Sequence, residues 1–121
     1  MSKPITVSVY ETIGSQYCVA SSDGQRIFDR IVSAFTEELD ICLSFKNVTS
    51  LTSAFLNAAI GQLYGRYEVK IIQKLLTIVD IDPTDLSLLR RVVENAKLYF
   101  EDPLRFESIV TETNEALANG S

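Results

Sequence analysis

The amino-acid sequence predicts one α/β domain in which helices pack on a small mixed β-sheet. Short runs with a period of two, typical of strands, alternate along the chain with longer runs whose apolar residues recur at helical spacing. Their order, β-β-α-β-α-β-α, favours helices layered on a sheet. With 121 residues, 46% hydrophobic and 22% charged, the chain has an ordinary globular composition. We expect this domain to cover residues 1–104 and an acidic helix or tail to cover 105–121.

The first elements are two strands and a helix. Residues 5–10 alternate apolar and polar side chains, which predicts a half-buried strand, and 12–14 form a turn before a short second strand at 16–19. Ser22 and Gln25 have the spacing of a capping box, so a helix should begin there. Its apolar stripe consists of Ile27, Phe28, Ile31, Val32, Phe35 and Leu39.

The next strand is expected at the centre of the sheet. In residues 41–45 both alternating sets of side chains are uncharged, which predicts a strand covered on both faces. Residues 67–74 are a short helix or an irregular link, and 75–81 are a strand rich in β-branched residues.

The last long helix carries the clearest signals. Asp82 is its expected N-cap, Pro83 occupies the first helical position and Pro103 ends it. Its apolar stripe is Leu86, Leu89, Val92, Val93, Ala96 and Phe100. A weaker terminal helix would carry Phe106, Ile109, Val110 and Leu117.

Composition argues against several classes of function. The chain has no histidine, so it has no imidazole base and no histidine metal ligand, and we expect neither an enzyme nor a cofactor. The formal net charge is −5, and residues 101–121 contribute most of it, with one basic and five acidic residues. An acidic chain argues against nucleic acid as a partner.

The two cysteines indicate the compartment. Cys18 and Cys42 stand alone, without the paired spacing of a zinc site, so no metal is expected. The first ten residues do not resemble a signal peptide, which favours the reducing cytoplasm. We expect both to be buried thiols in strands.

Nineteen consecutive residues, 47–65, carry no charge. They hold too many polar groups for a membrane span. On a helical wheel, residues 52–65 separate into a core face and a second face that is small and neutral. The core face is Phe55, Leu56, Ala59, Ile60 and Leu63, and the second is Ser53, Ala54, Asn57, Ala58, Gly61 and Gly65. Either the rest of the chain covers this second face, or a partner docks on it.

Hydroxyl side chains gather where this neutral helix begins. They are Thr49, Ser50, Thr52 and Ser53. Capping of the helix explains them without any function. Phosphorylation is the alternative, because a phosphate is favoured at a helix N-terminus and would add negative charge to a neutral surface.

The run from Leu43 to Asn57 resembles the signature of STAS domains, named for sulfate transporters and anti-sigma-factor antagonists. Val48 to Phe55 is similar to the V-x-x-[IL]-T-S-x-F motif of a bacterial STAS-like family of unknown function. The strand and helix at 78–96 fit the same pattern, so the resemblance spans most of residues 5–100 and implies a STAS-like fold.

The resemblance also implies a phosphorylation switch, but this chain lacks one of its residues. In the antagonists the segment ends in Asp-Ser-Ser-Gly, and the second Ser is phosphorylated by a kinase of the histidine-kinase-like ATPase type. These four positions fall on Thr52, Ser53, Ala54 and Phe55. Because Ala54 has no hydroxyl, Ser53 is the remaining candidate phosphoacceptor.

We therefore expect a non-enzymatic regulatory module that binds a protein partner. The resemblance implies a bacterial protein whose partner is a histidine-kinase-like ATPase or an anti-sigma-type regulator. We expect the module to be cytoplasmic, a monomer or a weak homodimer, with no membrane partner. The expected docking residues are Asn47, Thr49, Ser50, Ser53, Ala54, Asn57, Ala58 and Gly61.

A small ligand-binding domain or enzyme is the alternative. Asp80, Asp82 and Asp85 follow a strand at its carboxyl end, where open α/β sheets place their ligands. Mg²⁺ or a nucleotide would be the ligand to test.

Overall fold

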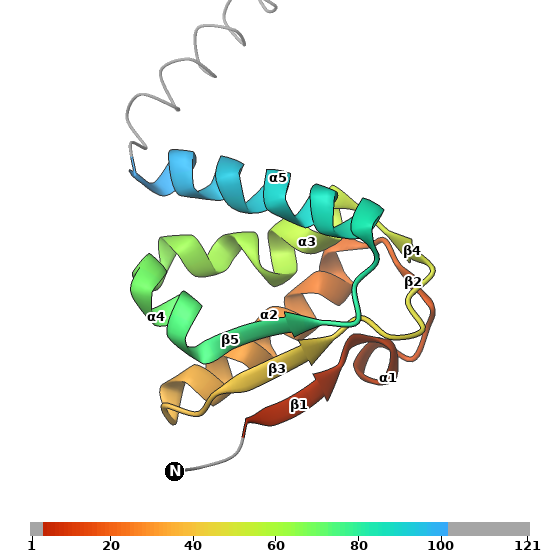
Figure 1. Cartoon of the computed structure of the whole chain (residues 1–121), viewed down its shortest axis with the longest axis horizontal. Coiled ribbons are helices and arrows are strands. Elements are labelled where there is room, and N and C mark those ends of the chain that lie inside the picture. The colour runs from red at the N-terminus through yellow and green to blue at the C-terminus, as the bar shows by residue number, and fades with distance from the viewer. Residues whose placement is uncertain (1–3, 102–121) are drawn as a thin grey trace, which may run out of the picture.

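Three parallel strands form the main sheet, in the order β1–β3–β5 (Figure 1). The computed structural model describes residues 4–101. β1 (Ile5–Ser8) pairs with β3 (Ile41–Ser44), and β3 pairs with β5 (Leu76–Val79). The α/β class and the central place of β3 are confirmed.

The direction of the strands differs from the expected mixed sheet. A second, separate pair joins β2 (Tyr17–Cys18) to β4 (Ser50–Leu51), and this pair is parallel too. The mixed sheet is therefore wrong for residues 4–101, because a crossover segment returns the chain to the same end before each new strand.

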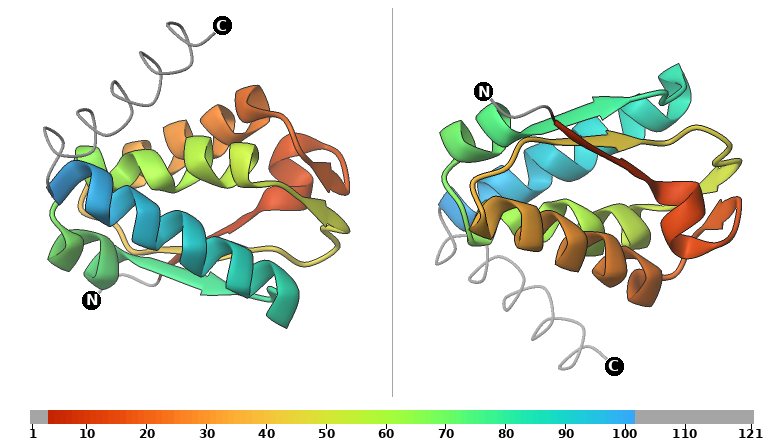
Figure 2. Two further views of the ribbon diagram at one scale, coloured as in Figure 1. Left: turned by 90° about the horizontal axis from the view of Figure 1, so that it is seen from above. Right: turned by 90° about the horizontal axis from the view of Figure 1, so that it is seen from below.

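The helices account for most of the residues that the structure describes. They are α1 (Val9–Ile13), α2 (Ser21–Thr36), α3 (Ser53–Ala59), the 3-10 helix η1 (Gly61–Gly65), α4 (Val69–Leu75) and α5 (Pro83–Glu101). Seen from above, α3 lies between α2 and α5 (Figure 2). No helix within residues 4–101 is long and apolar enough to cross a membrane.

Among residues 4–101, helices cover one face of the main sheet and leave the other face open. Val7, Leu43 and Ile78 share a register position and point into the core, where Leu43 is fully buried. The alternate positions carry Thr6, Cys42 and Thr77, of which Thr6 and Thr77 are exposed and Cys42 is half-buried. The expectation that β3 is covered on both faces is therefore wrong, since α2, α3 and α5 all lie on the same side (Figures 1 and 2).

The first strand is shorter than predicted because a helical turn follows it. Ser8 Oγ accepts a hydrogen bond from Glu11 N at 3.1 Å, which caps α1. Gly14 ends the turn in the left-handed region, at φ 77°, and its N–H donates to Tyr10 O. The S-x-x-E capping signature at Ser8 thus overrides the alternating pattern of residues 5–10.

The capping box expected at Ser22 does not form. The N-cap of α2 is Ala20, which offers no side-chain hydrogen bond. Gln25 instead donates to Asp29 Oδ1 and accepts from Gln62 Nε2. The side chain that would have closed the box is used to join two helices. The predicted core stripe is confirmed at Ile27, Phe28, Ile31 and Phe35, with Val32 and Leu39 half-buried.

The predicted helix at 52–65 is divided into α3 and η1. α3 ends at Ala59, and the tighter η1 follows from Gly61 to Gly65. Glycine is a poor helix former, and both glycines stand where α5 approaches closely. The predicted core face is confirmed, because all five of its side chains are at most 2% exposed.

The second half of the chain follows the predictions closely. Residues 69–75 are helical, β5 lies within the predicted strand, and Asp82 Oδ1 caps α5 by accepting from Asp85 N at 2.9 Å. The expected terminal helix, the end at Pro103 and the segment 105–121 lie outside the described residues.

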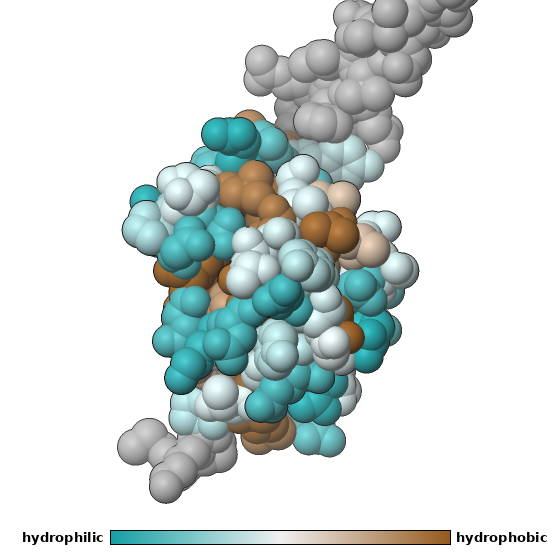
Figure 3. All heavy atoms as spheres, turned by 90° about the vertical axis from the view of Figure 1, so that its right-hand side faces the viewer, coloured by the Kyte–Doolittle hydropathy of each residue, from teal (hydrophilic) through white to brown (hydrophobic). Residues whose placement is uncertain are grey.

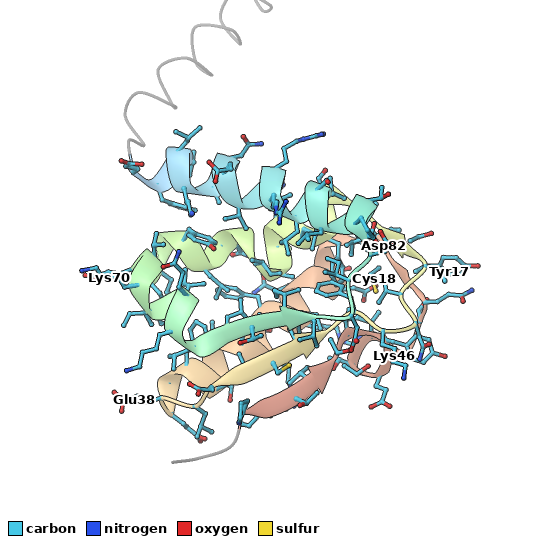
Figure 4. All side chains as sticks on the ribbon, in the orientation of Figure 1. Tyr17, Cys18, Glu38, Lys46, Lys70 and Asp82 are labelled. Atoms are coloured by element: carbon cyan, nitrogen blue, oxygen red, sulfur yellow. The ribbon has the colours of Figure 1, made fainter. Side chains whose placement is uncertain are left out.

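The two thiols have different environments. Cys18 is fully buried, as predicted, whereas Cys42 lies on the open face of the sheet and is half-buried. In Figure 4 the Cys18 side chain points inward and the neighbouring Tyr17 points away from the molecule.

Candidate functional site

The loop between β3 and α3 is anchored to the turn between α1 and β2 through the backbone oxygen of Gln16. Thr49 donates to Gln16 O from its backbone N–H at 2.9 Å and from its hydroxyl at 3.3 Å, and Ser50 N lies 3.3 Å from the same oxygen. Asn47 is exposed, with φ 71°. Thr49 is exposed as well, whereas Ser50 is half-buried in β4. The three expected docking residues of this loop therefore differ in how exposed they are to a partner.

Thr52 is the residue that caps α3. Its hydroxyl accepts from Phe55 N at 3.2 Å and donates to Val19 O at 2.6 Å. Ser53 is the first helical residue and is exposed. Capping thus explains Thr52 and leaves the Ser53 hydroxyl pointing toward solvent with no hydrogen-bond partner among residues 4–101.

The chain itself covers one edge of the neutral helix face. Ala58 is half-buried, because α2 crosses α3 next to Gly24. A β-carbon at position 24 would lie 2.9 Å from Ala58 Cβ and closer still to Phe55 O. Small residues on both helices allow this approach, and Gln62 strengthens it by donating to Gln25 Oε1 at 2.8 Å.

The carboxyl end of the same face is covered by α5. Gly61 is buried, and a β-carbon there would lie 3.6 Å from Val92 Cγ1. Gly65 lies under the ring of Phe100, where any side chain would overlap the ring. Both glycines are explained by packing.

The middle of the face remains free. Ser53, Ala54 and Asn57 are exposed, although the face as a whole is free of charge. The two explanations offered by the sequence therefore each account for a part of it: α2 and α5 cover Ala58 and Gly61, whereas Ser53, Ala54, Asn57 and Gly65 stay exposed.

A groove continues this open surface toward α5. It has a volume of about 510 Å³ and lies between α3, η1 and the last two turns of α5. Every residue that lines it is uncharged: Asn57, Gly61, Gln62, Asn95, Ala96, Tyr99 and Phe100. We call Ser53, Ala54 and Asn57 together with this groove the neutral surface.

The contribution of α5 to this surface was not predicted from the sequence. The apolar stripe predicted for this helix includes neither Asn95 nor Tyr99. One signal was present, since Asn95 and Tyr99 are uncharged and four residues apart, which places them on the same side of a helix. Only the packing of α5 beside α3 joins them to Asn57.

At the end of the molecule that carries β2 and β4, the exposed hydrophobic side chains are scattered. Tyr17 and Val19 are 55% and 44% exposed there, and Figure 3 shows the hydrophobic residues of this end as separate small patches among hydrophilic ones.

The three acidic residues at the end of β5 have structural partners. Asp80, at φ 58°, accepts from Ser44 Oγ at 2.7 Å, and Asp82 caps α5. Burial, and then the nearby charge of Asp82, raise the pKa of Asp85. Within residues 4–101 no three Cys, Asp or Glu side chains gather as they would around a metal ion.

Comparison with known proteins identifies one family. The model of the family described as STAS-like domain of unknown function (DUF4325) matches residues 23–86, which is more than half of the chain. This range includes α2, β3, the neutral helix and the start of α5. No curated protein and no solved structure matches the chain.

Proposed function

Because the chain belongs to the family of STAS-like domains of unknown function, we propose that it is a non-enzymatic regulatory module that docks a protein partner through the neutral surface. The observation that carries the proposal is the uncharged groove beside three exposed neutral residues of α3. Charged side chains are depleted at the centre of protein interfaces, whereas aromatic ones are enriched there.

The chemistry of the neutral surface defines the partner it would accept. Asn57, Gln62 and Asn95 offer amide donors and acceptors, and the side chains of Tyr99 and Phe100 offer aromatic area. A partner segment with a small apolar anchor and unpaired backbone groups would satisfy both. The resemblance to anti-sigma-factor antagonists supports an ATPase of the histidine-kinase-like type, or an anti-sigma-type regulator, as that partner.

Ser53 is the proposed point of regulation. Its hydroxyl is exposed at the first position of α3 and is not used for capping. A phosphate there would bring about two negative charges into a surface that otherwise has none. We expect Ser53→Asp to weaken docking and Ser53→Ala to leave it unchanged.

Site-specific crosslinking tests the proposal. A photoreactive amino acid at position 54 should capture a protein partner in native cell extract, and the captured protein, once purified, should bind the wild-type module. Ala54→Glu should weaken that binding at least tenfold, because it buries an unpaired charge in the interface.

Gln73→Glu is the matched control, since it adds the same charge at an exposed position of α4. It should leave binding unchanged, and circular dichroism should show that both variants are folded. Equal binding by wild type and Ala54→Glu, with both folded, contradicts docking through the neutral surface.

A further inference from the structure

The outer edge of β1 is a second surface that no other part of residues 4–101 covers. β1 is an edge strand of the main sheet, and no strand within residues 4–101 pairs with its outer side (Figure 1). Ile5 N donates inward to Asp40 O at 2.8 Å. Because successive residues of a strand direct their backbone groups to opposite edges, the N–H and C=O of Thr6 face outward.

A small cavity lies directly beside this edge, between β1 and α2. Its volume is about 180 Å³. Five apolar residues line it, Ile5, Val7, Ala34, Leu39 and Ile41, and three exposed polar or charged residues, Arg30, Ser33 and Glu37, form its rim. Ile5 is 37% exposed although it belongs to the core-facing set of β1. The unpaired edge of the sheet and the incompletely buried part of the core therefore lie at the same place.

We propose that a second copy of this chain fills this edge, with the two β1 strands antiparallel about a two-fold axis at Thr6. The two Thr6 residues would then exchange both of their backbone hydrogen bonds, as a hydrogen-bonded pair of an antiparallel ladder does. Ile5 of each copy lies opposite Val7 of the other on the core side, so four apolar side chains close the two cavities.

The ends of β1 fit this register. Pro4 of one copy lies opposite Ser8 of the other, and Pro4 has no N–H to donate. The carbonyl of Ser8 needs no such donor, because Ser8 is the N-cap of α1 and its carbonyl accepts the first bond of that helix. The proline therefore leaves no unpaired acceptor.

The charges of α2 favour a second copy of this chain, rather than a strand of another protein, as the occupant of this edge. Arg30 and Glu37 lie on either side of Ser33 and Ala34, at the cavity. Two α2 helices packed antiparallel about the same axis bring Arg30 of each copy against Glu37 of the other. Neither residue has an ion pair of its own, since the one salt bridge among residues 4–101 joins Arg26 to Asp23. The rim is thus self-complementary.

Sedimentation velocity over a concentration series, up to about 1 mM, measures this dimer. Thr6→Pro removes the outward N–H without touching the bonds to β3 and should give a monomer, whereas Thr6→Val keeps the N–H and should dimerise as wild type does.

A charge swap provides the independent test, because Arg30 and Glu37 are exposed and their replacement leaves the fold intact. Arg30→Glu places like charges across the axis and should weaken the dimer about tenfold, and the added Glu37→Arg should restore it. A wild-type chain that stays monomeric over the whole range overturns the proposal. A dimer that Ala54→Glu abolishes and Thr6→Pro leaves intact overturns it as well, since that dimer would use the neutral surface.

Discussion

Gly24 of α2 and Ala58 of α3 hold the two helices in closer contact than any larger pair of residues would allow. A β-carbon at position 24 would lie 2.9 Å from Ala58 Cβ, and real β-carbons essentially never come so close. The small residues of the neutral helix therefore serve the fold at this point, and the surface open to a partner begins beyond them.

Gly24→Ala should destabilise the protein. In an exposed helix the change would stabilise by about 1 kcal/mol, because alanine is the better helix former. Here the added methyl group overlaps α3, and overpacking costs about 1–3 kcal/mol, so the sign should reverse. Urea denaturation measures the difference, with Ser22→Ala in the first turn of α2 as a control that should change little. A more stable Gly24→Ala variant would contradict the close approach.

Thr52→Ala should cost about 1–2 kcal/mol of unfolding free energy. The variant loses the bond from Phe55 N to the hydroxyl and the bond from the hydroxyl to Val19 O, so the start of α3 and its tie to β2 both weaken. Thermal unfolding is the measurement. Ser53→Ala is the neighbouring control and should change the stability by less than about 0.5 kcal/mol, because its hydroxyl is exposed. Similar losses in both variants would contradict the assignment of Thr52 as the cap.

The two thiols should differ in reactivity. Cys18 is fully buried, and burial, with a smaller effect of the Asp23 charge, raises its pKa from 9.0 to about 11. At neutral pH that change alone lowers the thiolate fraction about 100-fold. Labelling of the folded protein with a thiol reagent should therefore modify Cys42 first, as the single variants Cys18→Ala and Cys42→Ala would show. Equal rates at the two positions would contradict this.

The raised pKa of Cys18 also predicts a loss of stability in alkali. The folded-state pKa lies above the value of 9.0 for the unfolded chain, so the neutral thiol stabilises the fold fully below pH 9. This contribution should disappear as the pH rises from 9 toward about 11. Urea denaturation at several pH values measures it. Cys18→Ala should lose stability less steeply than Cys42→Ala over this interval, and equal slopes would refute the prediction.

Asp80 should tolerate asparagine better than alanine. Its backbone is left-handed, at φ 58°, and its carboxylate accepts from the hydroxyl of the buried Ser44. Asparagine keeps an acceptor and adopts this backbone readily, whereas alanine loses the bond and adds strain of about 1 kcal/mol. We expect a loss of about 2 kcal/mol for Asp80→Ala and less than 1 kcal/mol for Asp80→Asn. Calorimetry compares them, and an Asn variant as unstable as the Ala variant would show that the carboxylate charge is what matters.

Much of the fold was predictable from the sequence, because its signals are local. The core stripe of α2, the core face of α3 and the Asp82 cap of α5 depend on residues within a few positions of each other, and the structure has them as predicted. The predictions were wrong where a contact with a residue far along the chain competes with the local signal. Ser22 and Gln25 have the spacing of a capping box, but Gln25 is bonded to Gln62, 37 residues away.

The candidate site was predictable only in part. The uncharged stretch pointed to α3, and Ser53, Ala54 and Asn57 are indeed exposed there. The groove depends on Asn95 and Tyr99 of α5, which are far from α3 along the chain and carry only a weak pattern of their own.

By itself the sequence determined the α/β class, the order of the elements other than α1 and β4, and the absence of charge on both faces of one helix, because these depend on composition and on periodicity within single elements. Only the tertiary structure decided which part of that helix stays exposed, since α2 covers it at Ala58 and α5 at Gly61. The same holds for the open face and the free edge of the sheet. The physical reason is that a residue is buried by another element that folding brings against it. The periodicity of one element does not say which other element that is.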